Sequence, residues 1–385
     1  MTTARIECLD GLRGLAAIWV LLGHAAILSG WKIPILHSPS LAVDLFMMLS
    51  GFLMAFHYQE RRAREPWAAP STWGTFWVRR FFRIAPLYYV LLLAAILLGP
   101  TLGAARDTIA SAVPGAGTLD GRYLDQSWQN VLMHVTFAFG FSPYYGFRTA
   151  LPDWSIGLEM AFYAAFPFLM IAVARLGFIA TAIGASVCCY LLSVTFAGYF
   201  EAFDEPSLLA MKLPIFLGGM LIAASLTAQG HRRLLLLAIA AAICLIPIRG
   251  VANHGVAPVI RLLSLASLAA LADCHRMPRL AAMNRIIPAI ARMLGGRVAA
   301  FLGDTSYGVY LLHLLVMLPV LQGIIKLLQP ASAPVLFMAT VMIVIPIVYL
   351  VAWVLHLWIE RPGIKLGRML LAMLRTKVRA ESEFA

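Results

Sequence analysis

Two ionisable side chains, Arg13 and His24, lie in or at the edge of the first apolar stretch, with ten residues between them. Eleven residues of α-helix turn through about 1100°, roughly 20° more than three full turns, so both side chains project from one helical face about 16 Å apart. Such groups are costly in lipid and usually face a protein interior or a wet cavity, where they serve a reaction or a transport path. Alternatively, Arg13 reaches lipid phosphates and His24 bonds a neighbouring helix.

Polar side chains also interrupt the second apolar stretch, where a purely structural bundle would carry leucine. Asp44 enters this stretch, and Ser50 followed by Gly51 lies deeper in it. An aspartate at that depth is costly, so Asp44 is a candidate for substrate binding, although an interfacial cap would also explain it. The small Ser50 and Gly51 pair would let two helices approach closely, and packing explains this pair as well as substrate binding does.

Two later stretches carry further candidates for substrate contact. Ser155 and Glu159 are four residues apart, so they share one side of a helix, with Glu159 one turn inside the membrane. A carboxylate at that position needs a partner. Tyr307, Tyr310 and His313 follow one another at three-residue spacing and form a stripe. Tyr307 is interpreted as an interfacial anchor, whereas His313 lies deeper and is harder to explain by packing.

Composition identifies the chain as a polytopic membrane protein. Hydrophobic residues make up 61% and charged residues 12% of its 385 residues, whereas about a quarter of the residues of an average globular protein are charged. The net charge of +12 comes from basic residues in short loops, which act as orientation signals and contact lipid phosphates. We therefore expect membrane lipid, and no nucleic acid, as a partner. The five cysteines show no metal-binding spacing, so no metal site is predicted.

Apolar stretches long enough to span a bilayer predict the topology. They lie near residues 14–30, 41–58, 84–103, 155–174, 176–198, 210–228, 234–249, 257–273, 299–325 and 335–358. The basic loops at 59–83 and 274–297 and the basic C-terminal tail should all be cytoplasmic, which requires an even number of crossings between them. We therefore predict an all-α integral membrane protein with about ten transmembrane helices in one bundle and both termini cytoplasmic. A weaker stretch near 128–146 is predicted to be re-entrant or interfacial, within an external region at about 104–153.

A single transmembrane domain is expected over residues 1–374, followed by a short basic and polar cytoplasmic tail at 375–385. The first apolar stretch is short enough to be mistaken for a secretory signal peptide. Its leader is only weakly basic, however, because Glu7 and Asp10 offset Arg5. A retained first helix is also what the charge distribution requires, so we interpret this stretch as a membrane anchor.

Several motifs, in order along nearly the whole chain, resemble those of the membrane acyltransferase family 3. They are LDGLRGLAAIWVLLGH at 9–24, VDLFMMLSGF at 43–52, FWVRRFFRIAPLYY at 76–89, PDWSIGLEMAFY at 152–163, GDTSYGVYLLH at 303–313 and IERP at 359–362. The resemblance implies ten core transmembrane helices, an acyl-CoA donor used from the cytoplasm, and a glycan or lipid-linked saccharide acceptor modified toward the outside. Members include O-antigen, exopolysaccharide and Nod-factor O-acetyltransferases, so acetyl-CoA and the bacterial inner membrane are expected. One departure is MMLSGF, where an aromatic pair commonly precedes SGF.

Some members of this family carry an additional SGNH hydrolase-like domain after an extra helix. This chain ends soon after the last predicted span, so it resembles the stand-alone type. No bound cofactor is expected, because acyl-CoA is a co-substrate.

Acyl transfer from a thioester to a hydroxyl needs a base for the hydroxyl proton, and the pKa of histidine suits that role. His24 is the candidate base, and a transient acyl-histidine is the rival mechanism. Guanidinium groups match phosphate oxygens, so Arg13, Arg80 and Arg83 are candidates for donor binding, unless the last two are only orientation signals. Glu159 is placed beside the acceptor. The remaining candidates for substrate contact are Asp44, Ser50, Ser155, Tyr310 and His313.

Two other classes of function stay open at this point. A transporter or flippase for a glycan or lipid-linked intermediate would also place ionisable groups at mid-membrane, although it would more typically show paired half-repeats with broken helices. A non-catalytic scaffold for polysaccharide export would not need the buried histidine.

Overall fold

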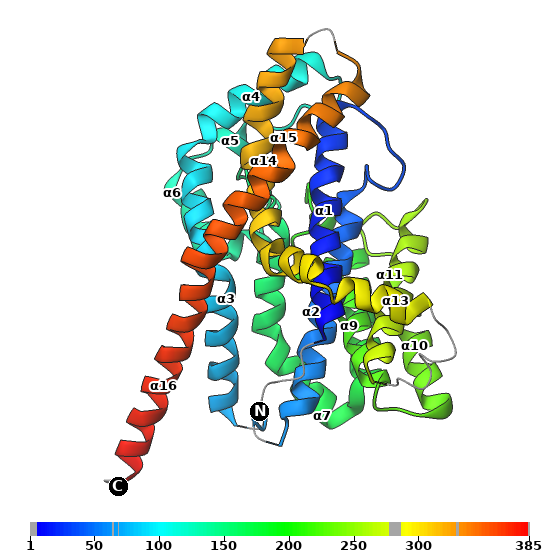
Figure 1. Ribbon diagram of the computed structural model, residues 1–385. Helices are drawn as coiled ribbons and strands as arrows, with labels where there is room; N and C mark the ends of the chain where they lie inside the picture. The colour runs from blue at the N-terminus through cyan, green and yellow to red at the C-terminus, as the bar shows by residue number, and fades with distance from the viewer. Residues whose placement is uncertain (1–5, 64, 68, 277–285, 329–330, 384–385) are drawn as a thin grey trace.

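The computed structural model describes residues 6–63, 65–67, 69–276, 286–328 and 331–383 (Figure 1). Side chains are described for the same residues except 275–276 and 375–383. Within these ranges the protein is all helix, as predicted, with no strand. The helices of the first half are α1 (Glu7–Ser29), α2 (Pro39–Arg61), α3 (Pro70–Leu97), α4 (Gly99–Ala112), α5 (Gly121–Leu124), α6 (Trp128–Val135), η1 (Ala138–Phe141) and α7 (Trp154–Thr195). Those of the second half are α8 (Ala197–Glu201), α9 (Leu209–Ser225), α10 (Gly230–Cys244), α11 (Ala257–Arg276), α13 (Ile286–Leu294), α14 (Arg297–Leu328), α15 (Ala333–Leu355), η2 (His356–Glu360) and α16 (Arg361–Glu383).

Among the described residues, seven helices are long and apolar enough to cross a membrane: α1, α2, α3, α7, α11, α14 and the continuous helix formed by α15 and α16. The protein is therefore a multi-pass helical membrane protein. Helix α9 is apolar but only 17 residues long, and α10 has 15 residues. These two helices match two of the ten predicted spans, so the count of ten crossings stays a prediction.

Helix α7 contains two of the predicted spans, 155–174 and 176–198, and reverses direction between them. Gly177 has a non-helical backbone with φ of 82°, a conformation open to glycine because it has no Cβ. At its start α7 packs on η1, where Gly140 lies beside Gly157. Just after its end, the Tyr199 hydroxyl donates to the Phe141 carbonyl of the same η1. Because both ends of α7 lie at η1, its two halves run in opposite directions.

The third span begins earlier than its apolar pattern indicates. Helix α3 starts at Pro70, a residue preorganised for the first helical turn, and ends at Leu97, whereas the predicted span was 84–103. The connection between α2 and α3 is correspondingly shorter than the predicted loop at 59–83. The arginines of the RRFFR segment therefore lie within a helix. Trp73 and Phe76 pack this helix against α7 and against Trp67 of the α2–α3 connection.

The segment at 128–146 does not span the membrane. It forms α6, of eight residues, and the single-turn η1, joined by Phe137 in a left-handed conformation with φ of 60°. Eight residues of α-helix extend only about 12 Å, less than half of a hydrocarbon core. The segment packs on α3 through the Tyr89 hydroxyl, which donates to the Val135 carbonyl at 2.8 Å.

Glycines bring the central helices into close contact. A Cβ on Gly14 of α1 would lie 2.6 Å from the Leu302 Cβ of α14, and one on Gly51 of α2 would lie 2.0 Å from the Phe216 carbonyl oxygen of α9. Neither distance is possible for a real side chain, so both pairs of helices depend on glycine at their crossing. In Figure 1, α1 rises from the lower half of the molecule to its top, and α4 and α5 lie at the top. The α1 and α14 contact places the histidines of these two helices side by side.

Candidate active site

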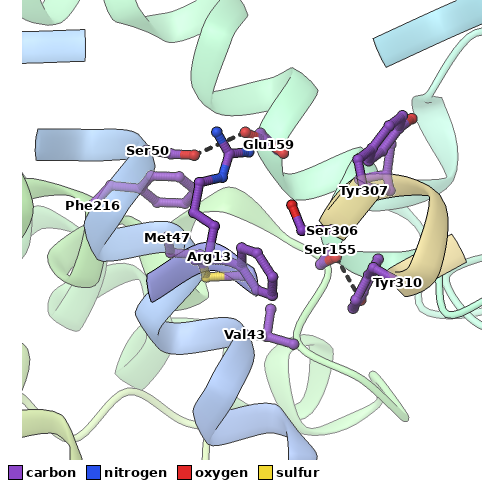
Figure 2. A pocket seen from close by; sticks show the side chains of 12 residues that line it. Arg13, Val43, Met47, Ser50, Ser155, Glu159, Phe216, Ser306, Tyr307 and Tyr310 are labelled. Carbon is purple, nitrogen blue, oxygen red and sulfur yellow. Dashed lines mark hydrogen bonds between the residues drawn. The ribbon is translucent and has the colours of Figure 1, made fainter. Parts of the chain in front are cut away.

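A pocket lies between α1, α2, α7, α9 and α14. Five of the predicted site residues line it, although they come from four helices: Arg13, Ser50, Ser155, Glu159 and Tyr310. In Figure 2 the Arg13 guanidinium points toward Ser50 and Glu159. We call this the inner pocket.

Glu159 is held by two hydroxyl groups. Ser50 Oγ donates to Glu159 Oε1 at 2.8 Å, and the Tyr163 hydroxyl donates to the same oxygen. Tyr163 follows Glu159 by four residues on α7, so one helix presents both groups. The carboxylate thus has neutral donors as its hydrogen-bond partners, and its charge stays available to a nearby cation or substrate.

Ser155 and Tyr310 form a second hydrogen-bonded pair in the inner pocket. The Tyr310 hydroxyl donates its hydrogen to the Pro152 carbonyl at 2.7 Å, so it must accept from Ser155 Oγ, also at 2.7 Å. Ser155 therefore keeps its lone pairs for a ligand. Tyr307, interpreted from the sequence as an interfacial anchor, also lines the inner pocket and donates to the Ile84 carbonyl at 2.9 Å. That interpretation is wrong, because α14 turns this tyrosine toward α3 and not toward lipid.

His24 contacts His313, and the surrounding carbonyls assign the protons of both rings. His313 Nδ1 lies 2.6 Å from the Tyr310 carbonyl, so it donates there, and in a neutral ring its Nε2 is then an acceptor. His24 Nδ1 lies 3.0 Å from the Val20 carbonyl and 3.1 Å from His313 Nε2, so it carries the proton that serves both acceptors. The Nε2 of a neutral His24 is therefore unprotonated, which is the state that a general base requires.

His24 does not line the inner pocket, so the predicted site has two adjoining parts. The connection runs through Tyr310, which lines the pocket with its ring and accepts from His313 with its carbonyl. His313 is fully buried, whereas His24 keeps some exposure.

Arg80 lies at a second pocket, which we call the Arg80 cavity. Its guanidinium carbon is 5.6 Å from the ring centres of both Phe76 and Tyr163, within the range of a cation–π contact. Its Nε is buried and has no hydrogen-bond partner among the described residues. Tyr163 also contacts Glu159, so it lies between the two cavities.

The two cavities follow one face of α2. Val43, Met47 and Ser50 line the inner pocket, and Met54, His57 and Arg61 line the Arg80 cavity. Their spacing of three or four residues is that of one helical stripe. A long, thin ligand could therefore extend along α2 from Arg80 to Arg13.

Arg83 lies outside both cavities. It forms an ion pair with the buried Glu360 of the IERP motif, and His356 Nδ1 donates to the other Glu360 oxygen at 2.9 Å. Its predicted contact with the donor thus requires a change of partner, and it stays a prediction. Its neighbour Arg79 pairs with Glu65 through two hydrogen bonds of 3.1 and 2.9 Å.

Asp44 also lies outside the inner pocket. It pairs with Lys212 of α9 at 2.6 Å and with Arg261 of α11 at 2.7 Å, and all three side chains are buried. Arg261 further donates to Asn253 Oδ1 at 2.8 Å. We call these residues the Asp44 ion cluster. Sequence reasoning missed Lys212 and Arg261, although a cation inside an apolar stretch is the same signal that drew attention to Asp44.

A hydrogen-bonded group at the start of α7 was also missed. The Tyr88 hydroxyl donates to Asp153 Oδ2 at 3.1 Å, and His134 Nε2 lies 3.7 Å from the same oxygen. Burial raises the pKa of Asp153 above its usual value. His134 stacks on Phe139 with ring centres 4.3 Å apart, so this group fixes α6 and η1 against the turn that carries Ser155. In the described part of the chain, no three metal-binding side chains cluster together.

Comparison with known proteins agrees with the arrangement of these motifs. The chain is 33% identical over 202 residues to the acyltransferase MdmB of Streptomyces mycarofaciens, which is 48% of this chain and 46% of that protein. It is 35% identical over 158 residues to BcsY of Komagataeibacter xylinus, named as a candidate membrane-bound transacylase, which is 40% of this chain and 35% of that protein. The matches thus span less than half of each relative. No solved structure matches the chain.

The model of the acyltransferase 3 family, described as an acyltransferase domain, matches residues 6–357. This range includes α1 to α15, the inner pocket and the two contacting histidines. The chain therefore belongs to the acyltransferase 3 family of membrane proteins.

Proposed function

We propose that this protein is a membrane-bound O-acyltransferase that moves an acyl group, namely acetyl, from a cytoplasmic acyl-CoA to a hydroxyl of a cell-surface or exported glycan. It works in the bacterial inner membrane, with lipid around its helices and acyl-CoA as a co-substrate. Family membership supports the reaction class. The donor, the acceptor and the membrane are part of the proposal.

The donor enters the helical bundle at the end where Arg80 lies. Arginine binds phosphate oxygens through forked N–H groups, and Arg80 has a buried Nε without a partner in the described part of the chain. The pantetheine arm of the donor is long and extended, and it follows the stripe of α2 that lines both cavities. Arg13 then contacts the donor in the inner pocket.

His24 acts as the general base. Its Nε2 accepts the acceptor's hydroxyl proton while the hydroxyl oxygen attacks the thioester carbonyl carbon. The tetrahedral intermediate expels the CoA thiolate, which takes the same proton back from Nε2. The products are an O-acyl ester and free CoA thiol. In the rival mechanism Nε2 itself attacks the thioester and forms a transient acyl-histidine.

Ser155 and Glu159 bind the substrates in the inner pocket. Ser155 accepts a hydrogen bond from a substrate group, because its own proton is donated to Tyr310. Glu159 stabilises a cation or a substrate hydroxyl, because its present partners are neutral. We assign Asp44 to the positioning of α2 and not to substrate binding, because two cations already neutralise it.

The observation that carries the proposal is the contact between His24 and His313, which leaves Nε2 of His24 unprotonated. We therefore expect His24→Gln to lower the rate of acyl transfer at least a hundredfold, the scale of general base catalysis, while CoA binding persists. The measurement is acetyl release from labelled acetyl-CoA by the protein in lipid nanodiscs. Mass spectrometry of surface glycans from cells with and without the protein then detects the transferred group.

The matched control is His37→Gln, which changes an exposed histidine in the connection between α1 and α2. It should leave both readouts unchanged. Near-normal turnover of His24→Gln would move the base elsewhere, with His313 as the next candidate. Glycan that is missing outside and accumulates inside, without a mass change, would instead favour a transporter or flippase.

A further inference from the structure

Two arginines in the region between α3 and α7 carry buried charge that the proposed reaction has not used. Arg106 of α4 is 8% exposed and Arg122 of α5 is 6% exposed. In the part of the chain that the structure describes, neither forms an ion pair with a carboxylate. Burying a guanidinium group without a counter-charge is costly, so such a pair needs an explanation beyond packing.

Arg122 has a backbone and an aromatic contact, and Arg106 interacts with the Tyr123 side chain, but none of these contacts compensates either charge. Arg122 Nε donates to the Thr149 carbonyl at 3.1 Å, and its guanidinium carbon lies 3.8 Å from the centre of the Phe147 ring. Arg106 Nε is buried with no partner among the described residues. Arg122 is oriented by its Nε hydrogen bond and one aromatic face, so its two terminal nitrogens can donate paired hydrogen bonds to an anion.

Both arginines lie near the histidine pair. Helix α4, which carries Arg106, contacts α14, the helix of His313, through Gln322 Nε2, which donates to Thr108 Oγ1 at 3.1 Å. Arg106 and Arg122 are also close enough to His24 to interact with it electrostatically. Figure 1 places α4 and α5 at the top of the molecule, toward which α1 rises, whereas Arg80 lies on α3, which extends to the bottom. The two arginines therefore lie toward the opposite end of the bundle from the start of α3, the end that the proposed function assigns to the acceptor.

Two carboxylates are near Arg122 without forming an ion pair with it. Asp153 accepts from Tyr88 and lies beside His134. Glu205 is in the connection between α8 and α9, where burial raises its pKa to about 7. These carboxylates reduce the positive charge of the region only in part, because burial disfavours the ionised form of both.

We infer that Arg106 and Arg122 bind an anionic group of the acceptor, a sugar carboxylate or a phosphate ester, and so place its reacting hydroxyl beside His24. This inference rests on the proposed function, because it names the chemical class of the acceptor. It also gives the reaction two separate charge contacts, one for each substrate, on opposite sides of the histidine pair.

The test measures binding in the absence of donor, to full-length protein in nanodiscs of phosphatidylcholine. The probes are trigalacturonate, its uncharged methyl ester, glucose 1-phosphate and glucose. We expect at least one anionic probe to bind about tenfold more tightly than its neutral counterpart, the scale of one charge-assisted hydrogen bond. Preference for trigalacturonate identifies a carboxylate, and preference for glucose 1-phosphate identifies a phosphate.

Arg106→Gln and Arg122→Gln should remove this preference, and Arg122→Lys should restore part of it. The matched control is Arg148→Gln, because Arg148 has contacts of the same kind. Its Nε donates to the Tyr144 carbonyl, and its guanidinium carbon lies 3.9 Å from the centre of the Tyr144 ring. It should keep the preference. Unchanged CoA binding shows that the variants are folded.

Equal binding of charged and neutral probes, or a preference that survives both glutamine variants, would overturn the inference. His24→Gln should retain anion binding. A failure of the proposed chemistry and a failure of this site would therefore be distinguishable.

Discussion

Two carboxylates within apolar helices of this protein, Asp44 and Glu159, look alike in the sequence and have opposite environments in the fold. Asp44 is neutralised by two buried cations from two other helices. Glu159 accepts hydrogen bonds from two neutral hydroxyls and faces a pocket with Arg13. The difference shows that a costly acid inside a membrane helix can join helices together or serve a binding pocket, according to which partners the fold supplies.

The stability of the protein should depend most strongly on the Asp44 ion cluster. Asp44→Asn leaves Lys212 and Arg261 buried without a counter-charge, and breaking such a pair costs about 3–5 kcal/mol. We expect a large loss of folded protein and a lower melting temperature, measured by fluorescence-detected size exclusion after heating. A variant that is as stable as the wild type would show that the cluster does not join α2, α9 and α11.

Glu159→Gln should give the opposite result. The amide keeps the size of the side chain and most of its hydrogen bonds, so thermal stability should change little, whereas loss of the charge should lower acyl transfer roughly a hundredfold. Turnover and melting temperature are measured on the same preparation. Activity that survives Glu159→Gln but not Glu159→Ala would show that Glu159 positions its hydrogen-bond partners and that its charge is not required. Full activity in both variants would remove it from the site.

The cations near these two carboxylates also differ in their contacts. Arg261 neutralises an acid, whereas Arg80 stacks on aromatic rings. Arg80→Ala should therefore weaken acyl-CoA binding by roughly 1.5–3 kcal/mol, and Arg80→Lys should recover only part of that. Calorimetry of CoA binding provides the measurement, and Arg62→Ala in the nearby α2–α3 connection is the control. Equal affinity in all variants would reduce Arg80 to an orientation signal.

A weaker effect is expected at Glu205, a half-buried carboxylate that lies outside the spans. Burial raises its pKa from 4.5 to about 7, and the charges of Arg122 and Lys212 oppose this rise only in part. An acid whose folded pKa is raised contributes stability below its unfolded pKa, and this contribution is lost as pH rises from about 4.5 to 7. The melting temperature of the wild type should therefore fall more between pH 5 and pH 8 than that of Glu205→Gln. Parallel profiles would contradict the shift.

Much of the fold could be predicted because hydropathy and length are properties of single segments. Each predicted span corresponds to a helix, and the segment at 128–146 is too short in its helical parts to cross. Boundaries were less predictable. Helix α3 begins at Pro70 because aromatic packing against α7 extends it beyond its apolar stretch. The two spans of α7 form one element because Gly177 allows a reversal without a loop.

Which side chains are chemically unusual can be read from the sequence, because an ionisable or hydroxyl group in an apolar stretch is costly wherever the helix lies. This criterion selected His24, Glu159 and Ser155. What each group does depends on helix packing, because partners such as Tyr163 and Lys212 lie on other turns or other helices. The contact of His24 with His313 joins residues 289 positions apart, and the packing of α1 on α14 brings them together. No local pattern contains that information, since the identity of the neighbouring helix depends on how all the helices pack at once.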